Sequence, residues 1–177
     1  MNTDIRIGYD FYRQRATEVA PALIGKYLCR RLDDNTVIRK RITETECYFG
    51  EDDTACHAHK GKTKRTATLY ESGGIAYVYL CYGIHSLLNV VTGDRDFPEA
   101  VLIRGVDGFD GPGKLTAGMR IDLSFNRENL CESTRLWIED GSPLPYTAAP
   151  RIGIDYADEK DRIVLWRFSA NENMSEL

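Results

Sequence analysis

The sequence predicts a single α+β domain over residues 1–177, in which helices flank a mixed, mainly antiparallel and curved sheet. The length of 177 residues fits one domain, since most domains have about 100–150 residues. A hydrophobic content of 42% with 28% charged residues is typical of a globular protein. Short β-branched and aromatic segments alternate with turn signals along the chain, which favours several strands over a helical bundle.

The first helix is expected near the start of residues 10–32. An apolar stripe follows Thr17, whose hydroxyl could accept hydrogen bonds from the first turn as an N-cap. Pro21 is tolerated only near a helix start, which agrees with that placement. Gly25 is expected to end the helix before a strand begins.

Two hairpins are predicted next. The turn signal at residues 33–35 separates strands at 26–32 and 36–47. A second turn at residues 82–85 separates strands at 75–81 and 86–92. Between the hairpins, residues 50–72 are polar and irregular, and a loop of that length indicates a functional role. The remaining elements are a strand at 100–104, a helix at 111–119 and strands at 136–138, 151–154 and 163–168.

Charge and cysteine content limit the class of protein. The net charge of −4 argues against a nucleic-acid partner at first sight, because phosphate binding requires a basic surface. Basic residues nevertheless cluster locally, at Arg30-Arg31, at Arg39-Lys40-Arg41 and at Lys60, Lys62, Lys64 and Arg65. Charge alone leaves both interpretations open. The five cysteines have no paired spacing and are expected to be reduced.

No apolar run approaches the roughly 18 residues of a membrane span, and the N-terminus has no signal-peptide pattern. A cytoplasmic protein, at the nucleoid or in a nucleus, is therefore expected.

Residues 43–48 are the first candidates for chemistry. Side chains two residues apart share one face of a strand, so Glu44, Glu46 and Tyr48 should point the same way. Burying two carboxylates is unfavourable, so this face either contacts water or lines a site. A carboxylate beside an aromatic side chain is typical of a general acid or base.

Residues 75–85 form the second candidate segment. Tyr77 and Tyr79 should share one strand face, and simple packing is the favoured interpretation for Tyr77. Tyr82 falls in the turn beyond them and is followed by Gly83. An aromatic ring at such an exposed turn does not contribute to a protein core. Aromatic side chains stack on bases with about 1–3 kcal/mol each, which fits a nucleic-acid contact.

Several ordered motifs together resemble the alkyladenine (3-methyladenine) DNA glycosylase family. They occur in the family order and cover most of the chain from about Phe11 onward. The matching segments are Glu44-Thr45-Glu46-Cys47-Tyr48, Asp53-Thr54-Ala55-Cys56-His57, Tyr77-Val78-Tyr79-Leu80-Cys81-Tyr82-Gly83, Leu88-Asn89-Val90, Ala100-Val101-Leu102-Ile103-Arg104, Gly111-Pro112-Gly113-Lys114-Leu115 and Pro150-Arg151-Ile152-Gly153-Ile154.

The resemblance implies a monofunctional glycosylase that acts on double-stranded DNA containing alkylated or deaminated purines. Glu46 would be the general base that activates a water, and Arg104 and the backbone of Ile152 would help hold that water. The matching site offers no lysine, so the expected products are a free base and an abasic site. The resemblance implies no cofactor and no metal, and a monomer suits the scanning of DNA for one site.

The same resemblance assigns binding roles. A flipped purine would lie in a pocket formed by Tyr48, His57 and Tyr79, with Asn89 at its wall. Tyr82 would fill the gap that the base leaves in the DNA stack. The remaining DNA contacts would come from Thr63, Arg65 and Lys114 to phosphates and from Leu69, which would pack near the DNA.

The sequence departs from the family pattern at a few positions. Only residues 105–110 separate Arg104 from the Gly-Pro segment, where the family usually has a longer connection that contains a helix. Cys56 replaces the small residue before the histidine, and Arg65-Thr66 replaces an Arg-Asn pair. Together with the acidic net charge, these differences predict weaker or more salt-sensitive DNA binding.

Three alternatives to a glycosylase stay open. Cys56, His57 and His59 are closely spaced, with His85 elsewhere, but structural zinc sites usually need paired spacings. Cys56 or Cys47 with His57 could form a nucleophilic site, although no third orienting group is evident. A non-catalytic module that binds damaged nucleic acid is the third alternative, and Glu46 argues against it.

Overall fold

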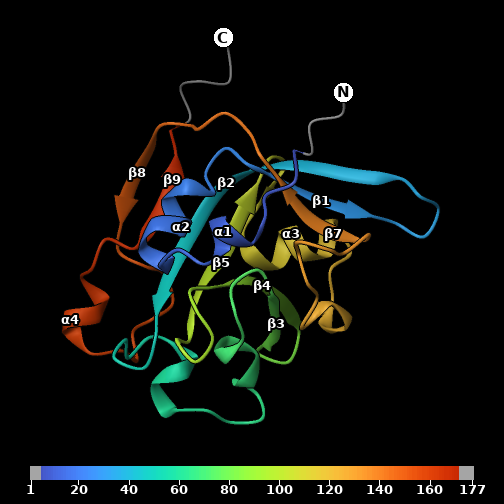
Figure 1. Cartoon of the computed structure of the whole chain (residues 1–177). Coiled ribbons are helices and arrows are strands. Elements are labelled where there is room, and N and C mark those ends of the chain that lie inside the picture. The colour runs from blue at the N-terminus through green and yellow to red at the C-terminus, as the bar shows by residue number, and fades with distance from the viewer. Residues whose placement is uncertain (1–4, 172–177) are drawn as a thin grey trace.

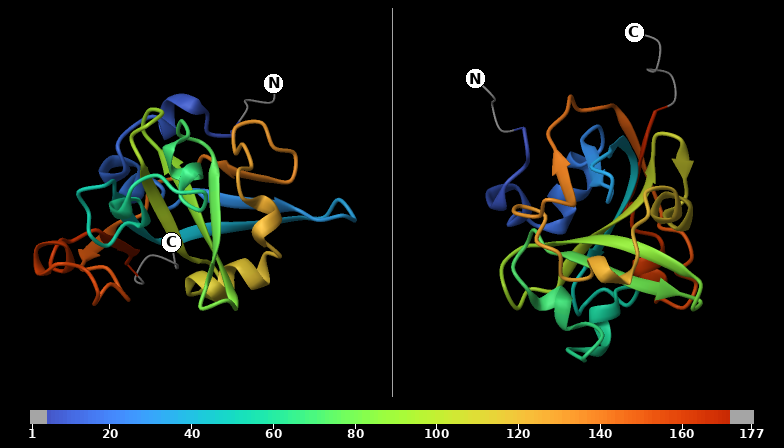
Figure 2. Two further views of the ribbon diagram at one scale, coloured as in Figure 1. Left: turned by 90° about the horizontal axis from the view of Figure 1, so that it is seen from below. Right: turned by 90° about the vertical axis from the view of Figure 1, so that its right-hand side faces the viewer.

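The computed structural model describes residues 5–171 and confirms the predicted α+β fold. Nine strands form one sheet in the order β3-β4-β5-β2-β1-β7, with β6 paired to β5, β9 to β2 and β8 to β9. Each of these pairings is antiparallel. The sheet curls, and α2 and α3 both pack against the face of it that carries the main hydrophobic core (Figures 1 and 2).

The elements have the following bounds. The helices are α1 (Tyr9–Tyr12), α2 (Ala16–Ala22), α3 (Pro112–Gly118) and α4 (Glu159–Arg162), and the 3₁₀ turns are η1 (His57–Lys60), η2 (Ala67–Tyr70) and η3 (Leu123–Phe125). The strands are β1 (Tyr27–Arg31), β2 (Val37–Phe49), β3 (Ala76–Cys81), β4 (His85–Thr92), β5 (Glu99–Val106), β6 (Phe109–Asp110), β7 (Leu136–Glu139), β8 (Tyr146–Ala149) and β9 (Arg167–Ala170).

The N-terminal helical region differs from the prediction. It consists of two short helices, and α2 begins after Arg15, so the assignment of Thr17 as N-cap is wrong. The carboxylate of Glu99 from β5 accepts the Ala16 N–H at 2.9 Å and caps the helix instead. Pro21 lies near the end of α2, where few hydrogen bonds remain for it to interrupt.

Gly25 follows α2 as predicted and must be a glycine. Its φ is +99°, and a Cβ there would lie 2.4 Å from the backbone oxygen of Ser142. Its N–H donates to the Ile42 carbonyl at 2.9 Å, which joins the helix end to β2.

The long strand β2 organises the sheet. Its first half pairs with β1 and its second half with both β5 and β9, so residues 44–46 lie in a central position. Thr45 donates its hydroxyl hydrogen to the Ala20 carbonyl at 2.7 Å and therefore faces α2. Since side chains alternate along a strand, Glu44, Glu46 and Tyr48 point to the opposite face, as predicted.

Two further strand predictions need correction. Residues 151–154 form no strand, because the Arg151 side chain is buried and the Ile152 N–H donates to a side chain rather than to a neighbouring strand. Of residues 163–168, only the last two belong to β9, since the short helix α4 occupies the chain just before them. The predicted loop at 50–72 contains η1 and η2.

Candidate active site

Glu46 is the most deeply buried carboxylate of the site, with a side chain that is 0% exposed. Its Oε2 accepts a hydrogen bond from the Tyr48 hydroxyl, and its Oε1 accepts one from the Ile152 N–H, both at 2.8 Å. Burial raises the pKa of Glu46 above its ordinary 4.5, although Arg104 and these two donors lower it. The charged form is therefore more basic than an exposed glutamate.

Arg104 reaches this carboxylate from the neighbouring strand β5. The register between β2 and β5 shifts twice near Glu44, and Arg104 has no partner across that irregularity. Such bulges often redirect a side chain next to an active site. The Nη1 atom of Arg104 lies 3.7 Å from Glu46 Oε1, and its Nε donates to Glu44 Oε1 at 3.1 Å.

A buried ion pair holds the segment that carries Ile152. Arg151 binds both carboxylate oxygens of Asp53, at 2.6 and 2.9 Å, and also donates to the Cys47 carbonyl at 3.0 Å. Its guanidinium carbon lies 4.9 Å from the centroid of the Tyr48 ring. The segment after β8 is thereby fixed beside β2, which places the Ile152 N–H on Glu46.

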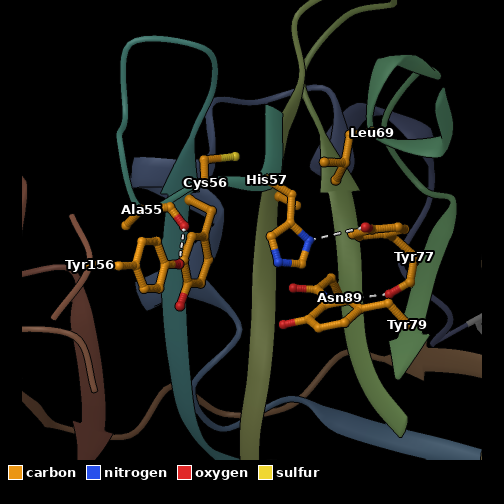
Figure 3. A pocket seen from close by; sticks show the side chains of 10 residues that line it. Ala55, Cys56, His57, Leu69, Tyr77, Tyr79, Asn89 and Tyr156 are labelled. Carbon is orange, nitrogen blue, oxygen red and sulfur yellow. Dashed lines mark hydrogen bonds between the residues drawn. The ribbon is translucent and has the colours of Figure 1, made fainter. Parts of the chain in front are cut away.

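An aromatic cavity lies next to Glu46. It has a volume of about 40 Å³, and the side chains around it come from β2, the loop before η1, η1, η2, β3, β4, β5 and the 150–158 segment. The lining residues are Tyr48, Ala55, Cys56, His57, Leu69, Tyr77, Tyr79, Asn89, Ala100 and Tyr156. Figure 3 shows His57 in the middle, with Tyr156 and Ala55 on one side and Tyr77, Tyr79 and Asn89 on the other.

His57 is held among these aromatic rings. Its Nδ1 lies 3.1 Å from the Tyr77 hydroxyl, and its ring centroid is 4.5 Å from that of Tyr79. Burial, followed by the charge of Arg65, lowers the pKa of His57 to about 4. The imidazole is therefore neutral at pH 7. Asn89 donates to the Tyr77 carbonyl at 3.2 Å, which fixes its amide at the cavity wall.

An open cleft of about 630 Å³ connects the cavity, Arg104 and Ile152 with the surface. Tyr82 lines this cleft at the turn between β3 and β4 and is 91% exposed. Its φ of +52° is followed by +67° at Gly83, and the Ile84 N–H donates to the Cys81 carbonyl. A tyrosine in this left-handed conformation is strained, as residues at functional sites often are.

The four expected DNA contacts lie in different places. Arg65 is exposed, lines the cleft and stands 5.5 Å from the Tyr79 ring. Thr63 lines an adjoining basin of about 370 Å³ that also includes Lys60. Lys114 is exposed on α3, next to the part of α3 that borders the cleft. Leu69 is only 2% exposed and lines the inner cavity, so its side chain belongs to the pocket rather than to an open surface.

Sequence reasoning missed several residues of this site. Tyr77 was interpreted as packing alone, whereas its hydroxyl contacts His57. Arg151 and Asp53 are 98 positions apart, and only their placement within family-like motifs hinted at them. Tyr156 lies in an irregular segment, is 68% exposed and donates its hydroxyl hydrogen to the Ala55 carbonyl. Its aromatic character beside an Asp was the only available signal.

The closely spaced Cys56, His57 and His59 do not come together as ligands. Burial raises the pKa of Cys56 to about 11, which keeps its thiol protonated. His59 Nδ1 lies 2.7 Å from the Glu51 carbonyl oxygen, away from the Tyr77 partner of His57. Across residues 5–171, no group of three or more His, Cys, Asp or Glu side chains is placed to hold a metal ion.

A basic carboxylate is buried beside an aromatic cavity, and its partners Tyr48, Arg104 and Ile152 line the open cleft; this arrangement defines a class of enzyme. The cavity can hold a flat aromatic group, and the carboxylate can withdraw a proton next to it. The arrangement fits a hydrolase that acts on a bond to such a group.

Comparison with known proteins agrees with this class. The model of the methylpurine-DNA glycosylase family matches residues 10–110 and 107–174, and the two segments meet at the shortened connection after Arg104. Three relatives are each named "Putative 3-methyladenine DNA glycosylase". The protein from Borreliella burgdorferi is 42% identical, and the alignment covers 92% of this chain and 95% of the relative. The protein from Methanocella arvoryzae is also 42% identical, and the alignment covers 90% of this chain and 89% of the relative. The protein from Rickettsia felis is 40% identical, and the alignment covers 95% of this chain and 94% of the relative.

The chain belongs to the methylpurine-DNA glycosylase family. It is a DNA glycosylase, a hydrolase of N-glycosidic bonds that functions in DNA repair, and its substrate is DNA. In the described part of the chain, no helix has the length and apolar character needed to cross a membrane.

Proposed function

We propose that this protein is a monofunctional glycosylase that flips a damaged purine out of duplex DNA and hydrolyses its bond to deoxyribose. The observation that carries this proposal is Glu46, which is buried and basic and lies between the Ile152 N–H and Arg104 at the edge of the aromatic cavity. A module that only binds DNA gains nothing from a buried carboxylate, whose charge repels phosphates.

In the proposed reaction, Glu46 accepts a proton from a water that adds to C1′ of the sugar. The N-glycosidic bond breaks, and its electron pair leaves with the base nitrogen. Arg104 and the segment at Ile152 orient the water, since both lie beside Glu46 Oε1. The products are a free base and an abasic site. The carboxylate does not form a covalent bond with the DNA, and no lysine is needed.

Recognition follows from the shape and neutrality of the cavity. Tyr48, His57 and Tyr79 enclose the extruded base, and aromatic faces attract a cationic alkylated purine by about 0.5–2 kcal/mol. A neutral His57 avoids repulsion of such a base. Asn89 limits the exocyclic groups that the cavity admits.

DNA contacts surround the entrance. Tyr82 is proposed to enter the gap in the base stack, and its strained, exposed position at the hairpin tip suits that role. Arg65, Thr63 and Lys114 would contact phosphates. Because these contacts lie around one site, a monomer is sufficient for binding.

The decisive experiment uses duplex oligonucleotides with one hypoxanthine or one ethenoadenine, together with bulk methylated DNA. Each reaction is analysed with and without hot alkali. Strand breaks that appear only after alkali, and that disappear in Glu46→Gln, are the expected result. Breaks without alkali would contradict the monofunctional reaction. Retained binding of damaged DNA without release of any base would instead favour the binding module.

A further inference from the structure

Two charged residues stand behind the proposed catalytic groups: Glu44 contacts Arg104, and Arg167 contacts both Glu44 and the backbone just before Ile152. Glu44 Oε1 accepts the Arg104 Nε–H at 3.1 Å and lies 3.5 Å from Arg167 Nη1. Arg167 also donates its Nε–H to the Pro150 carbonyl at 2.9 Å, directly before the segment that carries Ile152. We propose that Glu44 and Arg167 are positioning residues that hold Arg104 and the Ile152 segment apart from each other around Glu46; this inference rests on the proposed function.

The backbone supports this arrangement. Residues 44–46 lie between β5 and β9, where Glu46 pairs with Arg167 and Glu44 pairs with Ser169. Glu44 and Arg167 have side chains that are 16% and 24% exposed, so water competes with their contacts only in part. Their positions on the two paired strands β2 and β9 restrict their freedom to move.

The distances around Glu46 indicate that Glu44 prevents a direct hydrogen bond between Arg104 and Glu46. The 3.7 Å between Arg104 Nη1 and Glu46 Oε1 exceeds the roughly 2.7–3.2 Å of an N–H···O hydrogen bond. Oppositely charged groups in a buried site attract strongly, so an unrestrained Arg104 would close onto Glu46. Glu44 holds the Nε of Arg104 on its other side and thereby leaves the Nη1 donor available for the attacking water.

The effect on Glu46 has a definite sign. The groups that face its carboxylate are Arg104 from β5, the Tyr48 hydroxyl from β2, and the Ile152 N–H and Arg151 from the segment after β8. If Glu44 loses its charge, the field of Arg104 acts on Glu46 without a competing anion. The charged form of Glu46 is then stabilised, its pKa falls, and it becomes a weaker base.

The test compares Glu44→Gln and Arg167→Gln with Glu139→Gln, a matched control. Glu139 lies on β7 and pairs with Arg39, in the part of the sheet where β1 joins β7. Single-turnover excision by Glu44→Gln is expected to be slower by on the order of 10–100-fold, with unchanged Kd for damaged DNA, because misplaced catalytic groups reduce the rate and not the affinity. The acidic limb of its pH–rate profile should move to lower pH. Arg167→Gln should slow excision without moving the acidic limb of the pH–rate profile to lower pH. The control Glu139→Gln should match the wild type in both respects.

A second readout separates this inference from the proposed function. The Glu46 carboxyl carbon can be titrated by NMR in ¹³C-labelled protein, with or without DNA. A lower Glu46 pKa in Glu44→Gln than in the wild type supports positioning, even if the wild type releases no base and the proposed function fails. A Glu46 pKa that is unchanged or raised overturns the proposal. Slower excision with an unchanged pH limb and a lower melting temperature would assign Glu44 a purely structural role.

Discussion

Glu46 and Asp53 are both buried carboxylates that feel the charge of Arg151, but their surroundings differ. Each oxygen of Asp53 accepts one hydrogen bond from Arg151 and one from a backbone N–H, of Phe49 or of Ala55. Glu46 has one short hydrogen bond to each oxygen, and its nearest cation stays 3.7 Å away. The fully bonded carboxylate holds the fold in place, whereas the incompletely bonded one keeps the basicity that a catalytic step requires.

The largest expected effect comes from Glu46→Gln. Loss of a general base should slow excision by on the order of 10²–10⁴-fold. The folded-state pKa of Glu46 is raised, so its charge destabilises the fold at neutral pH, and the neutral amide should leave stability unchanged or higher. Single-turnover rates and thermal unfolding of the same preparations measure both effects. If Glu46→Gln unfolded at a lower temperature than the wild type, Glu46 would stabilise the fold as Asp53 does, and the contrast between the two carboxylates would fail.

Asp53→Asn should have the opposite pattern. It leaves the guanidinium of Arg151 buried without a counter-charge, which should destabilise the fold by about 3–5 kcal/mol. Urea unfolding measures this change. Glu71→Gln is the control, because its ion pair with Arg95 is exposed and should contribute less than about 1 kcal/mol. Equal effects of both substitutions would show that burial of the Asp53 pair contributes nothing.

His57 extends the comparison to pH. Its folded pKa of about 4 is below its ordinary 6.5, so the unfolded chain binds the proton first. The stability that His57 contributes is complete above pH 6.5 and is lost as the pH falls towards 4. His57→Gln should therefore reduce the loss of stability in this range, as measured by urea unfolding at several pH values. An identical pH dependence in both proteins would show that His57 is not desolvated.

Tyr82 provides the smallest expected effect on stability. Asparagine tolerates a positive φ better than tyrosine, so Tyr82→Asn should stabilise the free protein by about 1 kcal/mol or less. The same variant should excise bases from duplex DNA more slowly, because it lacks a ring to enter the stack. Tyr82→Phe retains the ring and should change neither property. Duplex excision that is unaffected in Tyr82→Asn would remove the wedge role.

Local patterns in the sequence predicted much of this site. Alternation along β2 placed Glu44, Glu46 and Tyr48 on one face, and turn residues placed Tyr82 at a hairpin tip. Both predictions depend on neighbours within a few positions. The bounds of the two hairpins followed for the same reason.

The residues that sequence reasoning missed depend on contacts between distant segments. Arg151 meets Asp53 across 98 positions, and the N-cap of α2 comes from Glu99, 83 positions away. The alternating apolar residues Ile152 and Ile154 resemble the pattern of a strand. The Ile152 backbone N–H nevertheless donates a hydrogen bond to the Glu46 side chain and not to a neighbouring strand. No local pattern distinguishes these cases.

The irregular register between Ile42 and Thr45 has a consequence for how this gene can change. Thr45 faces Ala20 and Glu46 points to the opposite face of β2, so one inserted or deleted codon in this stretch would turn the carboxylate into the apolar interior. A reading-frame-preserving insertion at the exposed tip of the β1–β2 hairpin, near Asn35, shifts neither side chain. Length variation among descendants of this sequence should therefore accumulate at the tip and be absent from the bulge.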